Sequence, residues 1–252
     1  MSDPFELLVD LHIGGARQGP GSDEATRRAI ALAGLENRVD LTIADIGCGT
    51  GASTLVLASD LDARITAIDF LPPFLERLDA AAERLGLADK ITTVSAPMDE
   101  LAFDPGSLDV IWAEGSIYNI GFDNGIRSWR PFLKPGGVLA VSEITWLTAH
   151  RPAELEGHWA NEYPEIATAS AKIAALEAAG YSPIGYFALP QSCWLDHYYR
   201  PAQARFEAFL DRHQDSPAAQ EIVEAERREI DLYEHFAAHF SYGFYIATRT
   251  TD

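Results

Sequence analysis

The stretch Ile43-Ala44-Asp45-Ile46-Gly47-Cys48-Gly49-Thr50-Gly51-Ala52 decides the fold. Ile43 and Ile46 suit a buried strand, and the glycines that follow can take positive φ and approach a ligand closely. A helix is expected directly after them, with its first N–H groups beside that ligand. The stretch therefore predicts the strand, loop and helix that open many nucleotide-binding α/β domains.

Apolar periodicity and turn residues predict an alternation of strands and helices along the chain. Strands are expected at 41–46, 64–69, 91–94, 108–112, 138–142, 181–189 and 242–248. Helices are expected at 5–13, 23–35, 52–59, 72–86, 123–133, 152–161, 164–179, 202–214 and 217–240, with Ser22 as an N-cap and Lys134-Pro135-Gly136-Gly137 as a turn. Such alternation is typical of βαβ units and a parallel sheet.

Two ligand classes fit the glycine pattern, a dinucleotide and S-adenosylmethionine. Asp45 stands two residues before Gly47, where it would repel a pyrophosphate but would suit an ammonium group. Asp69 ends the second expected strand, where its carboxylate can accept hydrogen bonds from both ribose hydroxyls. These two acids favour S-adenosylmethionine.

With these residues the chain resembles the class I S-adenosylmethionine-dependent methyltransferases over about residues 45–146. The motifs that carry the resemblance are Asp45-Ile46-Gly47-Cys48-Gly49-Thr50-Gly51, Asp69, Met98-Asp99, Glu114 and Leu133-Lys134-Pro135-Gly136-Gly137. A likeness to a small bacterial subgroup extends across the chain through Arg17-Gln18-Gly19-Pro20-Gly21-Ser22, the segment 111–122 and Cys193-Trp194-Leu195-Asp196-His197-Tyr198-Tyr199.

The resemblance implies a Rossmann-like α/β fold. Its mixed sheet would have seven strands with the last one antiparallel, helices on both faces, and a helical insertion before the last strand. One domain is expected over 1–252, with an N-terminal helical cap at 1–40, a cofactor-binding core at 41–146, and substrate-side helices and closing strands at 147–252.

The resemblance also implies residues that would contact the cofactor. The glycine loop would hold its methionine part with Asp45 near the amino group, Asp69 would bind the ribose, and Glu114 would line the methionine end. In one place the chain departs from the family pattern. Pro97 occupies the position at which the family usually has an acid that binds adenine, and Asp99 follows two residues later. Arg17 and Gln18 could reach the carboxylate of the cofactor and are added to these residues. The cofactor-binding candidates are therefore Arg17, Gln18, Asp45, Gly47, Cys48, Gly49, Gly51, Asp69, Phe70, Leu71, Met98, Asp99 and Glu114.

The methyl acceptor is expected to meet the loops after the fourth and fifth strands, since ligands of open α/β sheets bind at the carboxyl ends of the strands. Those loops hold Tyr118, Asn119, Glu143, Thr145 and Trp146. The covering segments hold His158, Trp159, Trp194, His197, Tyr198 and Tyr199. Aromatic faces suit a cationic methyl donor and histidine suits a general base, so the catalytic candidates are Tyr118, Trp146, His158 and His197. Burial in the core is the alternative for each of them.

The composition of the chain limits the kinds of partner that it is expected to bind. The net charge of −19 over 252 residues disfavours nucleic acid and anionic membranes, and leaves open both plain solubility and attraction of a cationic substrate. Two cysteines cannot form a disulfide framework, and no ligand spacing suggests a metal. The first residues lack the features of a signal peptide, and no apolar run is long enough to span a membrane. We therefore expect a cytoplasmic protein with reduced thiols.

The sequence thus predicts an S-adenosylmethionine-dependent methyltransferase that acts on a small molecule and releases S-adenosylhomocysteine. The alternatives are an NAD-dependent oxidoreductase and a non-catalytic S-adenosylmethionine-binding protein, whose substrate cavity would be filled or missing. The acceptor atom stays open, as does whether the aromatic-rich insertion pairs subunits in a homodimer or caps the site.

Overall fold

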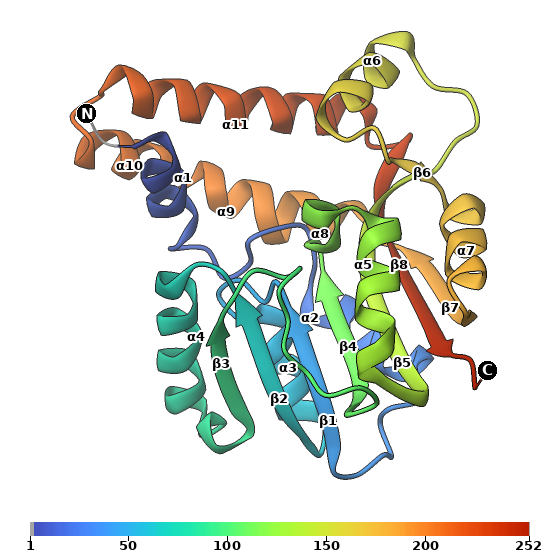
Figure 1. The fold of residues 1–252 in the computed structure, drawn as a ribbon. Coiled ribbons are helices and arrows are strands. Elements are labelled where there is room, and N and C mark those ends of the chain that lie inside the picture. The colour runs from blue at the N-terminus through green and yellow to red at the C-terminus, as the bar shows by residue number, and fades with distance from the viewer. Residues whose placement is uncertain (1–2, 252) are drawn as a thin grey trace.

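A mixed sheet forms the centre of the computed structural model, which describes residues 3–251. Seven strands pair in the order β3-β2-β1-β4-β5-β8-β7 (Figure 1). Their bounds are β1 Leu41–Ile46, β2 Ala63–Asp69, β3 Ile91–Ser95, β4 Leu108–Glu114, β5 Leu133–Trp146, β7 Tyr181–Ala188 and β8 Phe240–Arg249. β8 runs antiparallel to both β5 and β7, while the pairs among β1 to β5 are parallel. The expected seven-stranded sheet with an antiparallel last strand is confirmed.

Helices cover both faces of this sheet and its upper end. Their bounds are α1 Pro4–His12, α2 Asp23–Leu32, α3 Ala52–Asp60, α4 Pro72–Leu85, α5 Phe122–Trp129, α6 Ala153–Glu162, α7 Ala169–Ala178, α8 Gln191–Trp194, α9 Arg200–Gln203, α10 Phe206–Arg212 and α11 Pro217–Phe236. The Ser22 hydroxyl accepts a hydrogen bond from the Ala25 N–H, so the expected N-cap of α2 is confirmed. No helix within residues 3–251 is long and apolar enough to cross a membrane.

Four elements differ from the sequence-based expectation. The helix expected from Pro164 begins only at Ala169, because residues 167–168 form the short strand β6, which pairs with the end of β5. β5 runs on to Trp146, since β8 pairs with it along its whole second half. The expected turn at 134–137 is a bulge inside β5, where Leu133 pairs with Leu108 and Val138 with Val110. A helical run over 191–201, which includes a π-helical turn at Leu195–Tyr199, was not predicted, and the helix expected at 202–214 is divided between the end of α9 and α10.

Alternation along the strands divides the core into two layers. Ile43 and Ile65 pack toward α2 and α3, whereas Ile46 and Ile68 pack toward α5 and α7. Each large apolar side chain buried in this way stabilises the fold by roughly 1.5–3 kcal/mol. The two layers fix the strands in place, so that the strand ends form a rigid edge.

A layer of helices crosses the edge at which β1 to β4 end (Figure 1). α1, α9 and α11 belong to this layer, and a contact of 3.0 Å between His12 Nε2 and Glu226 Oε1 links α1 to α11. Ligands of open α/β sheets bind at the carboxyl ends of the strands. The helix layer therefore encloses the place where a ligand is expected.

Candidate functional site

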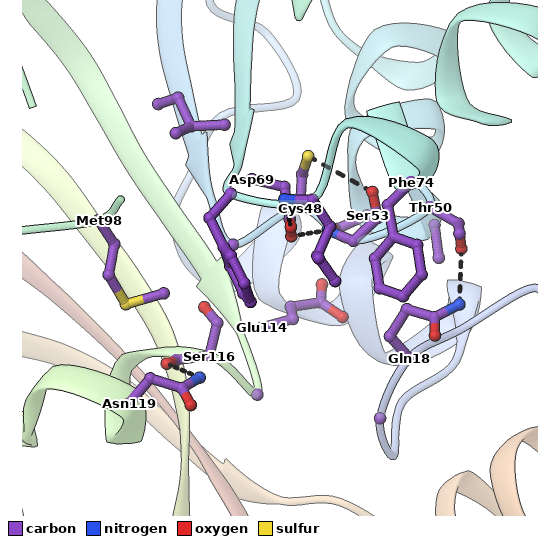
Figure 2. A pocket seen from close by; sticks show the side chains of 18 of the residues that line it. Gln18, Cys48, Thr50, Ser53, Asp69, Phe74, Met98, Glu114, Ser116 and Asn119 are labelled. Atoms are coloured by element: carbon purple, nitrogen blue, oxygen red, sulfur yellow. Dashed lines mark hydrogen bonds between the residues drawn. The ribbon is translucent and has the colours of Figure 1, made fainter. Parts of the chain in front are cut away.

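A cavity of about 450 Å³ lies at the carboxyl ends of β1, β2 and β4. Its walls are the glycine loop, the turn after β2, the turn at 96–99, the turn after β4 and the segment 17–20 (Figure 2). Among the predicted cofactor residues, those that line it are Arg17, Gln18, Gly47, Cys48, Gly49, Asp69, Phe70, Leu71, Met98, Asp99 and Glu114. The structure thus brings together eleven side chains and glycines that stand far apart in the sequence.

The glycine loop has a conformation that other residues would disturb. Gly47 has φ +73°, and a Cβ placed on it would lie 2.4 Å from the Ser116 Cβ. At Gly49, with φ +56°, a Cβ would lie 2.9 Å from the Gln18 side chain. Gly51 does not line the cavity; it has φ +91°, and a Cβ there would meet Leu78 of α4 at 2.2 Å. Gly51 lets α4 pack against the start of α3, and its assignment to the cofactor site stays a prediction.

Asp69 holds the glycine loop as well as facing the cavity. Its carboxylate accepts hydrogen bonds from the Gly49 N–H at 2.9 Å and the Leu71 N–H at 3.0 Å. Burial raises the pKa of Asp69, and these backbone donors act in the opposite direction. The carboxylate is therefore fixed at the end of β2, where its remaining lone pairs can accept hydrogen bonds from a ligand.

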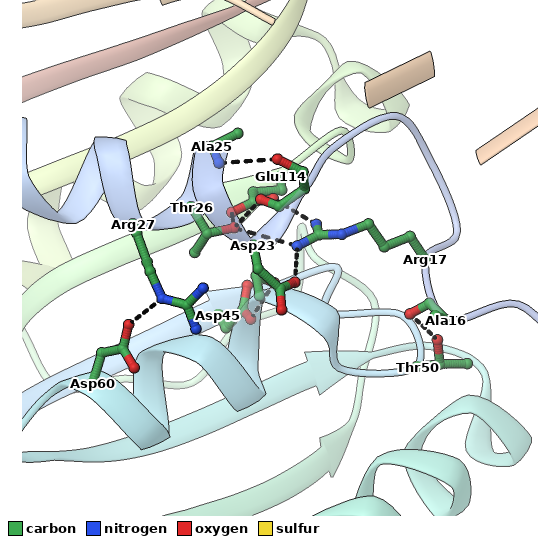
Figure 3. Close-up of polar contacts among 12 residues, drawn as sticks. Ala16, Arg17, Asp23, Ala25, Thr26, Arg27, Asp45, Thr50, Asp60 and Glu114 are labelled. Atoms are coloured by element: carbon green, nitrogen blue, oxygen red, sulfur yellow. Dashed lines mark hydrogen bonds and ion pairs between the residues drawn. The ribbon is translucent and has the colours of Figure 1, made fainter. Parts of the chain in front are cut away.

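Arg17 and Glu114 form an ion pair across the cavity wall, with 3.1 Å between Nη1 and Oε2 (Figure 3). The Glu114 carboxylate also accepts hydrogen bonds from Thr26 at 2.7 Å and from the Trp112 indole at 3.0 Å. The Arg17 guanidinium reaches Asp23 at 3.0 Å on its other side. This network ties the segment before α2 to the end of β4.

Gln18 lies where the N-terminal segment crosses the glycine loop. Its amide Nε2 donates to the His12 and Gly15 carbonyls and to the Thr50 hydroxyl, at 3.1–3.3 Å (Figure 2). Its Oε1 is buried and has no hydrogen-bond partner within residues 3–251. A buried acceptor without a partner is costly, so Oε1 is a group that a bound ligand can satisfy.

Asp45 lies beneath the cavity and does not line it, and the expected contact with an amino group stays a prediction. The side chain is fully buried, and its Oδ2 accepts hydrogen bonds from Ser53 at 2.8 Å and Thr54 at 2.6 Å. Burial raises the pKa of Asp45 to about 7. Asp45 therefore anchors the start of α3 beneath the glycine loop.

A second cavity, of about 750 Å³, adjoins the first. The two share Gln18, Gly19, Pro20, Gly115 and Tyr118 as lining residues. The second cavity is lined mainly by aromatic side chains: Tyr118, Trp159, Tyr163, Trp194, Tyr198, Tyr199, Phe240 and Tyr242. Its charged and titratable side chains are His158, Glu162, Arg228 and Glu229.

Two of the four catalytic candidates line these cavities. Tyr118 lies between the cavities and lines both, and His158 lines the second. Trp146 does not line either one; it is buried beside Phe240, with the Arg151 guanidinium 4.6 Å from its ring centre, because β5 extends through it. His197 is exposed on the π-helical turn and also lines neither cavity. The catalytic roles of Trp146 and His197 stay predictions that the lining of the two cavities does not support.

Sequence reasoning missed several lining residues. Ser116 follows β4 and its hydroxyl donates to the Ile46 carbonyl at 2.7 Å, which ties the turn after β4 to the end of β1. Tyr163 follows α6, Glu229 lies on α11 and Tyr242 lies on β8. No local pattern marks these three, since they meet only through the packing of α6, α11 and β8. Within residues 3–251, no cluster of three or more His, Cys, Asp or Glu side chains is arranged to hold a metal ion.

Residues 43–137 match the family model of a methyltransferase domain. The chain is 33% identical over 137 residues to 27-O-demethylrifamycin SV methyltransferase of Amycolatopsis mediterranei, an alignment that covers 53% of this chain and 50% of that protein. The chain spans about half or less of the length of the curated relatives that it matches first.

Solved structures are similar over nearly the whole chain. A methyltransferase from Geobacter sulfurreducens, crystallised with S-adenosyl-L-homocysteine, has a TM-score of 0.83 and 20% identity over 98% of both chains. The [4+2]-cyclase SpnF has a TM-score of 0.76 and 22% identity over 98% of this chain and 93% of its own. These likenesses show that the chain has the Rossmann-like methyltransferase fold, and the cyclase illustrates that the fold alone does not fix the reaction.

Proposed function

We propose that this protein transfers a methyl group from S-adenosylmethionine to a small-molecule acceptor and releases S-adenosylhomocysteine. The observation that carries the proposal is the meeting of two cavities at Tyr118 and Gly115. One is lined by a glycine loop and strand-end acids, and the other by aromatic side chains. A donor and an acceptor bound in them would face each other at the shared wall, and such positioning supplies much of the catalysis in a group transfer.

The residues of the first cavity fit S-adenosylmethionine. Asp69 would accept hydrogen bonds from the ribose hydroxyls, Phe70 and Leu71 would pack on adenine, and the turn at Met98 and Asp99 would face the adenine edge. The glycine loop and the Arg17–Glu114 pair would hold the methionine part, with Gln18 Oε1 as an unused acceptor. When bound, this cofactor supplies an electrophilic methyl group on a sulfonium ion.

The second cavity fits an acceptor with a large apolar or aromatic surface. Its rings come from α6 and the residue after it, the helical run after β7, and β8. Side chains leave about 750 Å³ of this cavity empty, whereas a non-catalytic cofactor-binding protein is expected to have it filled. The acidic chain and a cavity of this size favour a small molecule over nucleic acid.

Calorimetry with S-adenosylhomocysteine tests the cofactor. We expect wild-type protein to bind it, and Asp69→Ala to weaken binding by roughly tenfold or more, since a charged acceptor of two hydroxyl groups is lost. Asp104→Ala, an exposed acid outside the cavities, is the matched control and should bind as wild type does.

The contradicting result is no binding by wild-type protein up to millimolar S-adenosylhomocysteine. Fluorescence titration with NADH distinguishes the oxidoreductase alternative, because tight nicotinamide binding in the absence of S-adenosylhomocysteine binding would favour it.

A further inference from the structure

The charged side chains of the second cavity are mostly acidic. Glu229 comes from α11, the long helix of the layer over the strand ends (Figure 1), and Glu162 comes from the end of α6. Among residues 3–251, no Lys, Arg or His nitrogen lies within 4.0 Å of either carboxylate. Arg228 also lines the cavity, but it lies 4.0 Å from Glu224, and these two side chains are 68% and 67% exposed. Water therefore screens the charge of Arg228, and the two acids keep no counterion.

Four adjoining aromatic rings of this cavity form what we call the aromatic wall: Trp194, Tyr198, Tyr199 and Tyr242. The ring centres of Tyr198 and Tyr199 are 5.1 Å apart, and those of Tyr199 and Trp194 are 5.9 Å apart. Trp194 stacks on Tyr242 at 5.3 Å, and its indole N–H donates to the Ser241 hydroxyl at 2.9 Å. The faces of such rings attract a cation that lies within about 6 Å of the ring centre.

The Tyr199 hydroxyl joins the aromatic wall to the Glu229 carboxylate. It donates a hydrogen bond to Glu229 Oε1 at 2.9 Å, which is the one hydrogen bond that this carboxylate accepts in the described part of the chain. Tyr199 is itself 1% exposed, so packing fixes its ring. The carboxylate is thus held beside the rings, and its remaining lone pairs can accept charge-assisted hydrogen bonds from an ammonium group.

We propose that the second cavity binds an organic cation. A protonated or quaternary amine of the acceptor would pair with Glu229, and its apolar or aromatic body would pack on the aromatic wall, with Tyr199 as the residue that positions the Glu229 carboxylate. This inference rests on the proposed methyl transfer, for which it names the substrate class. The net charge of −19 acts in the same direction, because an acidic chain attracts cations.

The place of Glu229 separates the cationic group from the reacting atom. Glu229 lines the second cavity alone, whereas Tyr118 lines both cavities. A protonated or quaternary amine has no lone pair with which to attack a methyl group. The amine at Glu229 therefore anchors the acceptor, and the nucleophile is a second group of the same molecule that reaches the shared lining at Tyr118.

Neutral and anionic acceptors fit this lining less well. A neutral apolar body would displace water from Glu229 and Glu162 without supplying a counterion, and a charge that loses water without gaining a partner is costly. An anionic group would in addition be repelled by the two carboxylates. A cation is the ligand that satisfies both the acids and the rings.

Calorimetry with a charge series tests the cation. Phenethylamine, phenethyl alcohol and phenylacetate share a similar aromatic body and carry a positive, a neutral and a negative head group. We expect wild-type protein to bind the amine roughly tenfold or more tightly than the alcohol, and to bind phenylacetate most weakly. Equal affinity for the amine and the alcohol, or no binding of either, would overturn the cation site.

Glu229→Gln separates the charge from the shape, because its amide oxygen can still accept the Tyr199 hydrogen bond. Its preference for the amine over the alcohol should fall roughly tenfold, while its affinity for the alcohol stays within twofold. Glu221→Gln is the matched control, since it removes the same charge from an exposed position on α11 that lines neither cavity. The site is wrong if Glu229→Gln keeps the preference, or if both variants lose it equally.

Tyr199→Phe tests the positioning role and keeps the test valid where Glu229→Gln does not fold. It retains the ring and the carboxylate but removes the hydrogen bond between them, so the preference for the amine should fall roughly threefold with the affinity for the alcohol unchanged. An unchanged preference would overturn the positioning role of Tyr199.

Separate titration with S-adenosylhomocysteine distinguishes this inference from the proposed function. Wild-type protein that binds S-adenosylhomocysteine but does not prefer the amine would overturn the cation site and leave the proposed function standing. Wild-type protein that prefers the amine but binds no S-adenosylhomocysteine would refute methyl transfer and leave the cation site standing.

Discussion

The two cavities are built in different ways. The first is formed mainly by short loops that directly follow β1, β2, β3 and β4, together with the segment 17–20, and Asp69 at the end of β2 is bound by backbone N–H groups of two of these loops. The second is formed by side chains of α6, the helical run at 191–203, α11 and β8. The first therefore depends on local chain conformation, whereas the second depends on how distant helices pack.

This difference affects what each cavity can recognise. A loop with fixed backbone donors and positive-φ glycines leaves little freedom and suits one ligand. An aromatic-lined cavity offers large apolar faces and few directed hydrogen bonds, so changes of side chain can alter its ligand without altering the fold. The cofactor is accordingly the better determined of the two proposed ligands.

The largest effect is expected from Gly47→Ala. The added Cβ would lie 2.4 Å from Ser116 Cβ, so either the glycine loop or the turn after β4 has to shift. We expect the affinity for S-adenosylhomocysteine to fall on the order of 100-fold, measured by calorimetry.

Gly34→Ala is the matched control for this change. Gly34 also has positive φ, at +64°, but no atom lies within 4 Å of its added Cβ. Both variants carry the backbone strain of a left-handed alanine, about 1–2 kcal/mol. Equal loss of affinity in the two variants would contradict the close-approach role of Gly47.

An intermediate effect is expected on stability from Asp45 beneath the first cavity. Its folded pKa, about 7, lies above the ordinary value of 3.8, so the folded state holds the proton more tightly. The resulting stabilisation is complete below the unfolded pKa and is lost as pH rises toward the folded pKa. From pH 5 to pH 6.5, wild-type stability should fall by about 2 kcal/mol relative to Asp45→Asn.

Urea unfolding of the wild-type protein and of Asp45→Asn at pH 5 and pH 6.5 measures this change in the free energy of unfolding. Subtracting the value of the variant from that of the wild type removes the contribution of the other acids. Asn keeps one oxygen that can accept the Ser53 and Thr54 hydroxyls. A difference in stability that does not change with pH would show that Asp45 titrates at its ordinary pKa.

The smallest effect is expected at the rim of the second cavity. His197 is exposed and lines neither cavity, so His197→Ala should change methyl transfer and S-adenosylhomocysteine affinity by less than twofold. His158 lines the second cavity, and His158→Ala should slow transfer to the same acceptor several-fold with unchanged cofactor affinity. A larger loss of methyl transfer in His197→Ala than in His158→Ala would instead place the acceptor on the outer side of the π-helical turn.

Much of the first cavity could be predicted because its signals are local. A strand, positive-φ glycines and a following helix leave a continuous pattern, and Asp69 follows its strand directly. The expected and observed positions of side chains differ where tertiary contacts override such signals. Trp146 follows an expected strand end, but β8 extends β5 through it and buries it. Asp45 points away from the cavity because Ser53 and Thr54 of α3 hold it beneath the loop.

The sequence by itself determined the alternating α/β layout, the positions of the main strands along the chain and the choice of S-adenosylmethionine as the expected cofactor. These follow from periodicity and from residues close together in the chain. Only the tertiary structure decided which side chains line the second cavity. Tyr118 follows β4, Tyr163 follows α6 and Tyr242 lies on β8, and they meet through the pairing of β5 with β8 and the packing of α6. Such long-range packing leaves no local pattern, because each residue alone also fits an ordinary core or surface position.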